Sequence, residues 1–372
     1  MTDVFIVSDN ILSPLGATTE ANFAQLKKVS SGIRLHNDTK ISPEPFHASL
    51  FNNFQSNNKG TKFEQLLIGS IDDAIKNSGL NSKDKNTLLI ISSTKGNISL
   101  LETEGDSPAL KDKIALHHSA KLVAAHFGFV HQPVVVSNAC ISGLLALLTG
   151  MRLIQSGQYQ NIVVAGADVI SKFVLSGFQS FQAISKEACK PFDAARDGIN
   201  LGEGAATIIL SANKKDKNDI KITGGSVSND ANHISGPSRT GEELFQAIKK
   251  AIELAGLTAK DIDFISAHGT ATIYNDEMEA RAITLANMQN VPVNSLKGFY
   301  GHTLGAAGLI ESVVTIQSMK ENIVIPSKGY TQSGVTNSLN ITTTLQSATL
   351  NNCLKTASGF GGCNAALVFS KQ

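Results

Sequence analysis

The sequence lacks the features that mark several classes of protein. Its 372 residues carry a formal net charge of only +1, so nothing predicts a nucleic-acid partner or a membrane-surface face. No stretch comes near the roughly 18–20 consecutive apolar residues of a membrane-spanning helix. The first ten residues place no basic segment ahead of an apolar run, which is unlike a signal peptide. We therefore expect a cytoplasmic protein without a membrane span.

Cysteine is scarce, and its spacing is uninformative. The four cysteines form no CxxC pair and no His/Cys metal spacing; they are Cys140, Cys189, Cys353 and Cys363. This pattern favours free thiols in a reducing compartment over a disulfide framework. We expect neither a bound metal nor a cofactor.

What the sequence does contain is an α/β pattern that occurs twice. Residues 62–80 have apolar side chains at helical spacing, end near Gly79 and lead into the strand TLLIISSTKG. Residues 242–269 follow the same plan, with a helix that ends near Gly256 and the strand DFISAHG. The pattern predicts two related halves, 1–212 and 220–372, connected by the polar segment 213–219. Strands that alternate with helices predict helix-covered sheets, with ligands at the carboxyl ends of strands.

Cys140 is the strongest candidate for chemistry. It follows the apolar strand PVVV by the short turn SNA and precedes the helical pattern ISGLLALLTGMRLI. A thiol at a helix N-terminus faces unpaired backbone N–H groups and the positive end of the helix dipole, which favours the thiolate. A buried cysteine that acts as a small apolar residue is the alternative. The other three cysteines lack this setting.

Two histidines stand at comparable positions among small residues. His268 follows the strand DFISA, and His302 lies in FYGHTLGAAG at the start of a helix. Most histidines in loops are plain polar surface, but a cysteine and two histidines at strand ends suggest nucleophilic catalysis. Lys297 lies close enough to His302 to orient it or shift its pKa. Glycines on both sides of Phe360 suggest a loop that moves or that presents backbone N–H groups.

Five stretches, in order along nearly the whole chain, resemble the motifs of the β-ketoacyl-[acyl carrier protein] synthases, in particular the elongating type. They are VSNACISG, KPFDAARDGINLGEGAA, ISAHGTATIYND, SLKGFYGHTLGAAGLIE and GFGGCNAALVF. The resemblance implies a thiolase-like α/β fold, in which two related halves with pseudo-two-fold symmetry form five layers, αβαβα. It implies an acyltransferase that carries out a decarboxylative Claisen condensation in fatty acid, polyketide or polyene biosynthesis.

The resemblance also implies roles for individual residues. Cys140 would take an acyl group from a carrier-protein or coenzyme A thioester, with the backbone N–H groups of Cys140 and Phe360 as the oxyanion hole. His268 and His302 would favour decarboxylation of malonyl-carrier thioester to an enolate that attacks acyl-Cys140. Supporting roles fall to four further side chains: Lys297 and Glu311 in the histidine network, and Thr270 and Thr272 on the malonyl side. Phe360 would be the gate between the two half-reactions.

The implied partners are an acyl carrier protein, in its acyl- and malonyl-loaded forms, and a second ketosynthase subunit, identical or related. The strand around Val163–Ala165 is too apolar for a solvated sheet edge, so we expect a dimer. The chain departs from the family in being shorter, within 35–62 and 95–120, and in having Ser358 where many members carry an aromatic residue.

Two alternatives stay open. A thiolase-type enzyme would act on coenzyme A thioesters and would need a second cysteine as general base, for which Cys363 is the nearest choice. A non-catalytic, chain-length partner subunit would be expected to have lost the nucleophile, whereas Cys140, His268 and His302 are all present.

Overall fold

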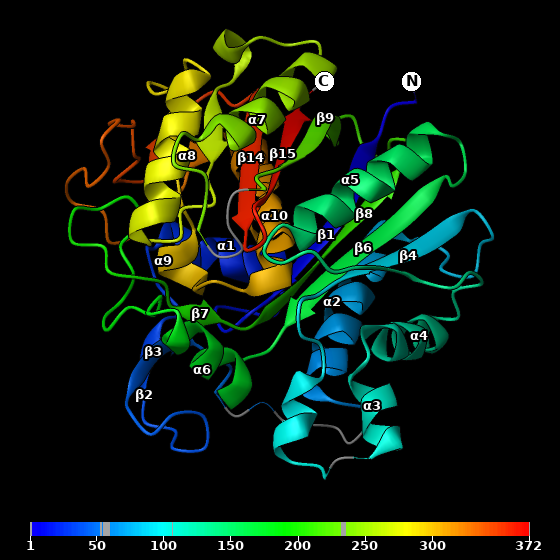
Figure 1. The fold of residues 1–372 in the computed structure, drawn as a ribbon. Helices are drawn as coiled ribbons and strands as arrows, with labels where there is room; N and C mark the ends of the chain where they lie inside the picture. The colour runs from blue at the N-terminus through cyan, green and yellow to red at the C-terminus, as the bar shows by residue number, and fades with distance from the viewer. Residues whose placement is uncertain (1, 53, 55–59, 106, 232–235, 372) are drawn as a thin grey trace.

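The computed structural model, which describes residues 2–52, 54, 60–105, 107–231 and 236–371, contains one large mixed sheet whose two halves have the same strand order (Figure 1). The first half runs in the order β5 (Val134–Val136), β4 (Thr87–Ser92), β6 (Asn161–Asp168), β8 (Gly204–Ser211) and β1 (Phe5–Leu12). The second runs β11 (Val293–Asn294), β10 (Phe264–Ser266), β14 (Asn352–Gly359), β15 (Cys363–Ser370) and β9 (Ile220–Asn229).

If the five strands of each half are numbered in the order in which they occur in the chain, both halves have the spatial order 3-2-4-5-1. The directions also agree: the first three strands of each order are parallel and the last two are antiparallel to their neighbours. The halves join where β1 pairs with β9, through Phe5 with Lys221 and Ile6 with Ile220. The repeated topology confirms two related α/β halves; their division at 213–219 stays a prediction.

Helices cover and separate the halves to give five layers. The helices α2 (Lys62–Ser78) and α4 (Leu116–Phe127) pack outside the first half, and α7 (Glu242–Leu254) and α8 (Ile273–Leu285) outside the second. Between the halves lie α5 (Ser142–Gln155) and α10 (Ala307–Glu321), which contact each other and strands of both halves. The layers are therefore αβαβα, as the thiolase-like fold requires.

The remaining elements lie around this frame. The helices are α1 (Thr19–Lys27), α3 (Pro108–Ile114), α6 (Lys172–Ser180) and α9 (Lys297–Tyr300), with 3₁₀ turns η1 (Ile98–Glu102), η2 (Ala259–Asp261) and η3 (Leu304–Ala306). Two small sheets contain β2 (Arg34–His36), β3 (Phe46–Ser49) and β7 (Leu201–Gly202), and β12 (Ile323–Val324) with β13 (Gln346–Ser347). Part of the shortened region 35–62, namely 53 and 55–59, lies outside the described residues.

Local sequence explains why the predicted helices begin and end where they do. The helix α2 begins at a capping box of Thr61 and Glu64 and ends at Gly79, whose φ of 70° is left-handed. The helix α7 is followed by Gly256, with φ of 71°. Both helices and the strands after them lie where the sequence pattern predicts.

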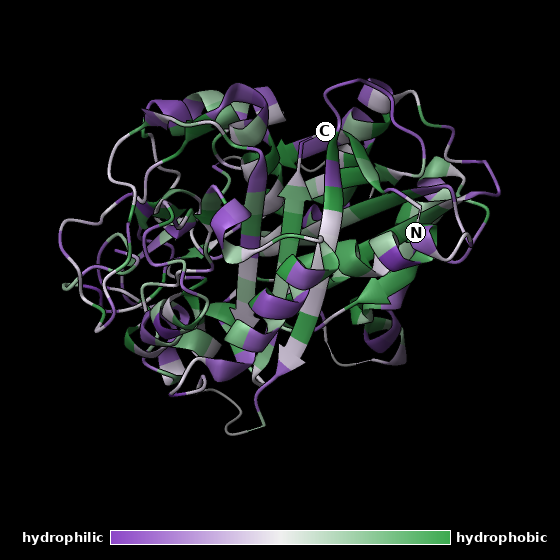
Figure 2. Cartoon of the chain, turned by 90° about the horizontal axis from the view of Figure 1, so that it is seen from above, coloured by the Kyte–Doolittle hydropathy of each residue, from purple (hydrophilic) through white to green (hydrophobic). Residues whose placement is uncertain are grey.

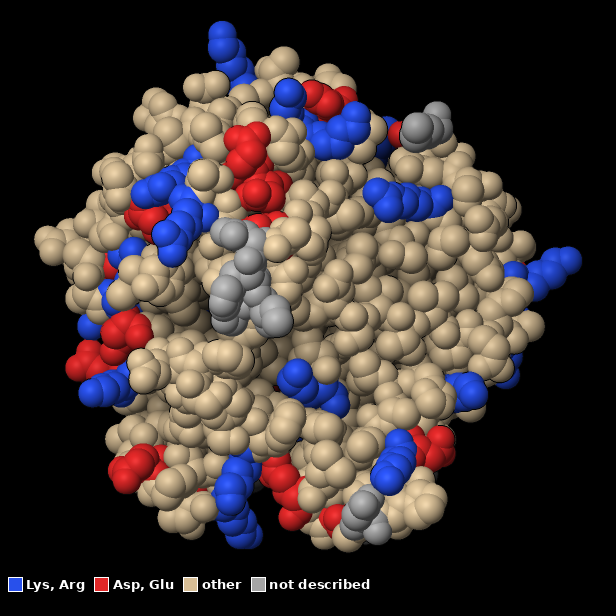
Figure 3. Space-filling model, in the orientation of Figure 1, with Lys and Arg blue, Asp and Glu red and all other residues tan. Residues whose placement is uncertain are grey.

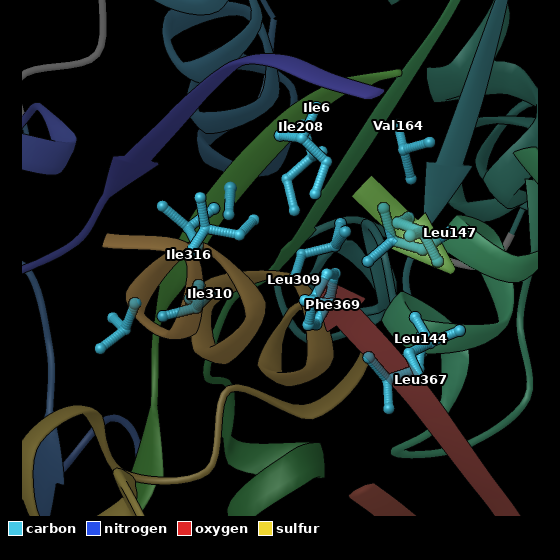
Figure 4. Close-up of a cluster of buried hydrophobic side chains, with 14 of the residues drawn as sticks. Ile6, Leu144, Leu147, Val164, Ile208, Leu309, Ile310, Ile316, Leu367 and Phe369 are labelled. Carbon is cyan, nitrogen blue, oxygen red and sulfur yellow. The ribbon is translucent and has the colours of Figure 1, made fainter. Parts of the chain in front are cut away.

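The core lies mainly between the two halves. Figure 4 shows side chains from α5 (Leu144, Leu147) and α10 (Leu309, Ile310, Ile316) meeting side chains of β15 (Leu367, Phe369) and of the first half of the sheet. Figure 2 shows the hydrophobic strands inside and hydrophilic residues mostly on outer helices and loops. Burial of these apolar side chains is what holds the halves together.

Two glycines set the close approach of α5 and α10. A Cβ on Gly143 would lie 2.8 Å from the backbone N of Leu309, and one on Gly308 would lie 2.8 Å from the backbone N of Leu144. Such a separation is too short for any side chain, so only glycine lets the first turns of both helices touch. Because Cys140 precedes α5 and His302 precedes α10, this contact brings the two reactive segments together.

Residues Val163–Ala165 do not lie at a sheet edge, so the expectation of a dimer contact there is wrong. These residues belong to β6, which lies inside the sheet with β8 on one side and β4 on the other. The strand is apolar because it is fully covered, so it needs no partner chain. The strand at the edge of the first half is β5. Among the described residues, no helix is long and apolar enough to cross a membrane.

Candidate active site

Cys140, His268 and His302 all lie in the segments that follow strands of the large sheet. Cys140 lies between β5 and α5, and His302 lies between β11 and α10, which are the matching elements of the two halves. His268 follows β10, two residues beyond its last residue, Ser266. The repeated topology therefore carries a cysteine on one half and two histidines on the other to the same place.

The turn that presents Cys140 is tight and closed by its own side chains. Ala139 has a left-handed φ of 43°, a strained conformation for a residue other than glycine. The hydroxyl of Ser142 accepts from the N–H of Asn138 (2.8 Å) and donates to the carbonyl of Ala139 (2.6 Å). The helix begins at Ser142 rather than at Cys140, so the thiol stands one residue before the helix cap, Ile141.

The thiol and the two imidazoles are in direct proximity. His302 Nε2 lies 3.0 Å from Cys140 Sγ. The two imidazole rings are perpendicular neighbours, with centroids 5.2 Å apart. The sulfur and one nitrogen of each ring all lie within 4.8 Å of one another. One small substrate group can therefore contact all three.

The backbone of His302 is fixed by the stretch INLGEGAA. Its N–H donates to the carbonyl of Asn200 (2.7 Å), and its carbonyl accepts from the N–H of Gly202 (3.0 Å). A Cβ on Gly202 would lie 1.9 Å from the carbonyl oxygen of Tyr300, so this close packing requires glycine. The stretch thus positions His302 without contributing a reactive group.

Burial holds both histidines neutral. The pKa of His268 and that of His302 lie well below the usual value, because desolvation disfavours the charged imidazolium and the ammonium groups of Lys297 and Lys355 repel it. Among the described residues, Nδ1 of neither ring has a hydrogen-bond partner. Neither ring is therefore locked in one tautomer, so each can accept or donate a proton at Nε2.

The expected thiolate at Cys140 is wrong for the free enzyme. Burial raises the pKa of the Cys140 thiol to about 12, with a further rise from the nearby Cys363, and these effects outweigh Lys297 and the Phe360 backbone hydrogen bond, which lower it. Cys140 and His302 therefore form a neutral thiol–imidazole pair.

Behind the histidines, one carboxylate is shared by two buried ammonium groups. Glu311 pairs closely with Lys297 Nζ and, through Oε2, with Lys355 Nζ at 2.8 Å. All three side chains are almost fully buried. Neither Lys297 nor Glu311 lies on the cavity wall. Both residues belong to the ion pairs behind the histidines, so Glu311 is not a substrate-binding residue in this structure.

The loop that carries His268 is held by two buried carboxylates that the sequence analysis missed. Glu279 accepts from the N–H groups of His268 (2.8 Å) and Gly269 (2.7 Å). Asp276 accepts from the N–H groups of Thr270 (2.9 Å) and Ala271 (3.1 Å). Their only signal is a pair of acidic residues, three apart, in the helical stretch that follows HGTAT.

The cavity in front of Cys140 is apolar and has about 440 Å³ of free volume. Its walls include both histidines and the predicted Thr270 and Thr272, whose hydroxyls lie 2.9 Å apart. Apolar side chains make up much of the remainder: Phe178, Phe181, Ile199, Ile273, Met278 and Phe360. A cavity of this size and lining fits an apolar acyl group.

Phe360 closes one side of this cavity. Its ring stacks on Phe178, with centroids 5.8 Å apart, and meets Phe181 edge-on at 5.3 Å. The ring is 38% exposed, and the next two residues, Gly361 and Gly362, have left-handed φ values of 88° and 75°. The hydroxyl of Ser358, just before this turn, donates to Asn364 Oδ1 (2.7 Å) across β14 and β15.

The compact cysteine–histidine set has ligand types that suit zinc. The charge around it does not favour a dication. Lys297 and Lys355 repel a proton from both imidazoles, and a divalent ion at the same atoms would meet the same field.

Comparison with known proteins agrees with this geometry. Residues 1–216 match the family model of the β-ketoacyl synthase N-terminal domain, and residues 220–331 match that of the C-terminal domain. A putative mitochondrial 3-oxoacyl-[acyl-carrier-protein] synthase of Schizosaccharomyces pombe is 30% identical over 326 residues, covering 82% of this chain and 72% of the relative. The 3-oxoacyl-[acyl-carrier-protein] synthase 2 of Vibrio cholerae is 28% identical, with 99% of both chains covered.

A solved structure of the ishigamide ketosynthase/chain length factor has the same fold. It superposes with a TM-score of 0.92 at 23% identity and covers 100% of this chain and 99% of its own. The family models span most of the sequence, and the catalytic-type residues meet in one cavity. The chain belongs to the β-ketoacyl synthase family.

Proposed function

We propose that this chain is a β-ketoacyl-[acyl carrier protein] synthase that condenses an acyl group held on Cys140 with a malonyl thioester, in fatty acid, polyketide or polyene biosynthesis. The observation that carries the proposal is the 3.0 Å contact between His302 Nε2 and Cys140 Sγ, with His268 beside it in an apolar cavity. A nucleophile, a base and a second neutral donor are the groups that the reaction requires.

The first half-reaction loads the enzyme. Cys140 Sγ attacks the thioester carbonyl as its proton passes to His302 Nε2, because the thiol is otherwise neutral. The carbonyl oxygen gains negative charge and accepts hydrogen bonds from the N–H groups of Cys140 and Phe360. The carrier thiolate leaves and takes up the proton from His302, which restores the neutral imidazole.

The second half-reaction makes the carbon–carbon bond. The neutral rings of His268 and His302 donate hydrogen bonds to the malonyl thioester oxygen, so the electron pair released with carbon dioxide is held as an enolate. The enolate carbon attacks the acyl carbonyl on Cys140, the C–S bond breaks, and the sulfur takes up a proton from solvent to restore the neutral thiol. A charged imidazolium would protonate the enolate too early, and the lowered pKa of both histidines prevents this.

The alternatives fit less well. Cys363, the candidate base of a thiolase, is absent from the cavity wall among the described residues; its thiol contacts the carbonyl oxygen of Phe360 at 3.5 Å. Burial also raises the pKa of Cys363 to about 11. A non-catalytic chain-length subunit has no need of the complete Cys140, His268 and His302 arrangement.

We infer an acyl carrier protein and a second ketosynthase-type subunit as partners. The relatives are named for acyl-carrier-protein substrates, and the ishigamide structure is named for a chain length factor as well as a ketosynthase. The edge strand β5 has no partner on its outer side among the described strands. Figure 3 shows a broad area over α5 and β6 with few charged side chains, which suits a subunit interface.

Free thiols at all four cysteines suit the cytoplasm.

Cys140 and His268 should matter to different half-reactions. Cys140→Ser should give no acyl adduct, because a serine hydroxyl has too high a pKa, yet it should still decarboxylate malonyl thioester. His268→Ala should acylate but decarboxylate about a hundred- to a thousandfold more slowly. His302→Ala should slow both acylation and decarboxylation, because His302 contacts Cys140 as well as lying beside His268. Intact-protein mass measures the adduct, and carbon dioxide release measures decarboxylation.

The control for this series is His117→Ala, which changes a histidine with a 61% exposed side chain away from the cavity. It should match the wild type in both assays. Condensation by His268→Ala at close to the wild-type rate would contradict the assignment.

Phe360→Ala should weaken the discrimination between acyl and malonyl thioesters more than it weakens folding. The ring closes the cavity beside the exposed or half-buried rings of Phe178 and Phe181, and the glycines after it permit movement. The measurement is the ratio of adduct formation with the two thioesters, alongside the thermal unfolding midpoint. Phe173→Ala, on the exposed side of α6, is the control. An unchanged ratio in Phe360→Ala would show that the ring is no gate.

The chain should form a dimer, alone or with a related subunit. Pairing along β5 would cover the unpaired strand edge and the uncharged area beside it. Sedimentation at micromolar concentration, of the chain alone and of the chain co-expressed with a chain-length-factor homologue, measures this. A monomer under both conditions would contradict the inference.

A further inference from the structure

Three consecutive backbone carbonyls, ending at His268, accept hydrogen bonds from two buried ammonium groups. Lys355 Nζ donates to the carbonyls of Ser266 (3.1 Å) and Ala267 (3.2 Å). Lys297 Nζ donates to the carbonyl of His268 itself (3.0 Å). Because both ammonium groups share Glu311, the strand end that carries His268 is fixed by one connected set of charges.

Lys355 is an unusual residue for its position. It lies in the middle of β14, is 0% exposed, and is flanked by the buried residues Leu354 and Thr356. A buried ammonium group is costly unless it is paired and fully hydrogen-bonded. Lys355 meets that condition through Glu311, the carbonyls before His268 and the carbonyl of Thr356 (2.6 Å). Packing alone would be served as well by an apolar side chain, so the lysine calls for a further explanation.

We propose that Lys355 is a positioning residue for malonyl-thioester decarboxylation, holding the backbone that carries His268 and adding positive charge beside both imidazoles. The proposal rests on the proposed function of the site. Lys355 is not on the cavity wall, so it acts through His268 and Glu311 and not by touching substrate. A fixed positive charge behind the imidazoles favours the negative charge that develops on the enolate oxygen.

Several charged or titratable groups face the two imidazoles. Cys140 contacts the ring of His302, and the others lie around the backbone that carries His268 or pair with one another; they are Asp276, Glu279, Lys297, Glu311 and Lys355, from α8, α9, α10 and β14. Of these, Lys297 and Lys355 lower the pKa of both histidines. Removing the Lys355 charge should therefore raise both histidine pKa values. A raised pKa means that the rings become protonated, and decarboxylation is lost, at a higher pH than in the wild type.

The test uses the full chain with Lys355→Met, which removes the charge and the donors, and Lys355→Gln, which keeps an N–H donor without the charge. Each variant is assayed for carbon dioxide release from malonyl-pantetheine across pH 5–8, and for acylation of Cys140 by octanoyl-pantetheine. Lys320→Met is the matched control, because Lys320 also pairs with a buried carboxylate, Asp9 (3.5 Å), at the end of α10 that lies away from His302.

We expect Lys355→Met to slow decarboxylation about ten- to a hundredfold, as misplacement of a reactive group does, and to change acylation less than about twofold. As the pH falls, both Lys355 variants should lose decarboxylation at a higher pH than the wild type does, and Lys320→Met should match the wild type. If Lys355→Met does not fold, Lys355→Gln decides by the same measurements.

The proposal would be overturned if Lys355→Met lost acylation and decarboxylation equally and lost decarboxylation at the same low pH as the wild type. Unchanged decarboxylation in Lys355→Met would overturn it as well. A wild-type chain that releases no carbon dioxide from malonyl-pantetheine or from malonyl-carrier protein would instead contradict the proposed function. The two failures are therefore distinguishable.

Discussion

The ion pairs between Glu311 and the two lysines Lys297 and Lys355 are the constraint on which the active site depends. A single buried carboxylate between two ammonium groups leaves an excess of positive charge, and this excess acts on the nearest titratable groups, His268 and His302. Breaking such a network by removing one partner typically costs about 3–5 kcal/mol, because the remaining charge stays buried. The same contacts fix the carbonyls of residues 266–268, so charge and geometry are set by one group of atoms.

The repeated fold explains how residues from distant parts of the chain come to share one cavity. Each half delivers a strand, a turn and a central helix, and the two helices touch at Gly143 and Gly308. One half supplies the thiol in this position and the other supplies His302. The halves are alike in topology but not in chemistry: the ion pairs belong to the second half, whereas the turn at Ala139 belongs to the first.

Much of this arrangement could be predicted from local sequence. The caps at Thr61 and Gly79, the strand before Cys140 and the glycine-rich turn at Phe360 are all specified by residues close in the chain. The contribution of Lys355 could not be predicted, because Lys355 lies 87 positions from His268 and reaches the carbonyls before it through sheet pairing of β14 with β10. The protonation of Cys140 was mispredicted for a related reason, since burial by segments distant in the chain raises the pKa of its thiol.

The most direct test of this account is the protonation state of the two histidines in the free enzyme. Long-range proton–nitrogen NMR spectra of the imidazole-labelled protein, assigned with His268→Ala and His302→Ala, distinguish neutral from charged rings. Because desolvation and two lysines hold both pKa values well below the usual one, these two rings should take up a proton only at a lower pH than an imidazole of ordinary pKa. Titration of His268 or His302 at the usual pKa of an imidazole would contradict the claim that buried charge keeps the catalytic imidazoles neutral.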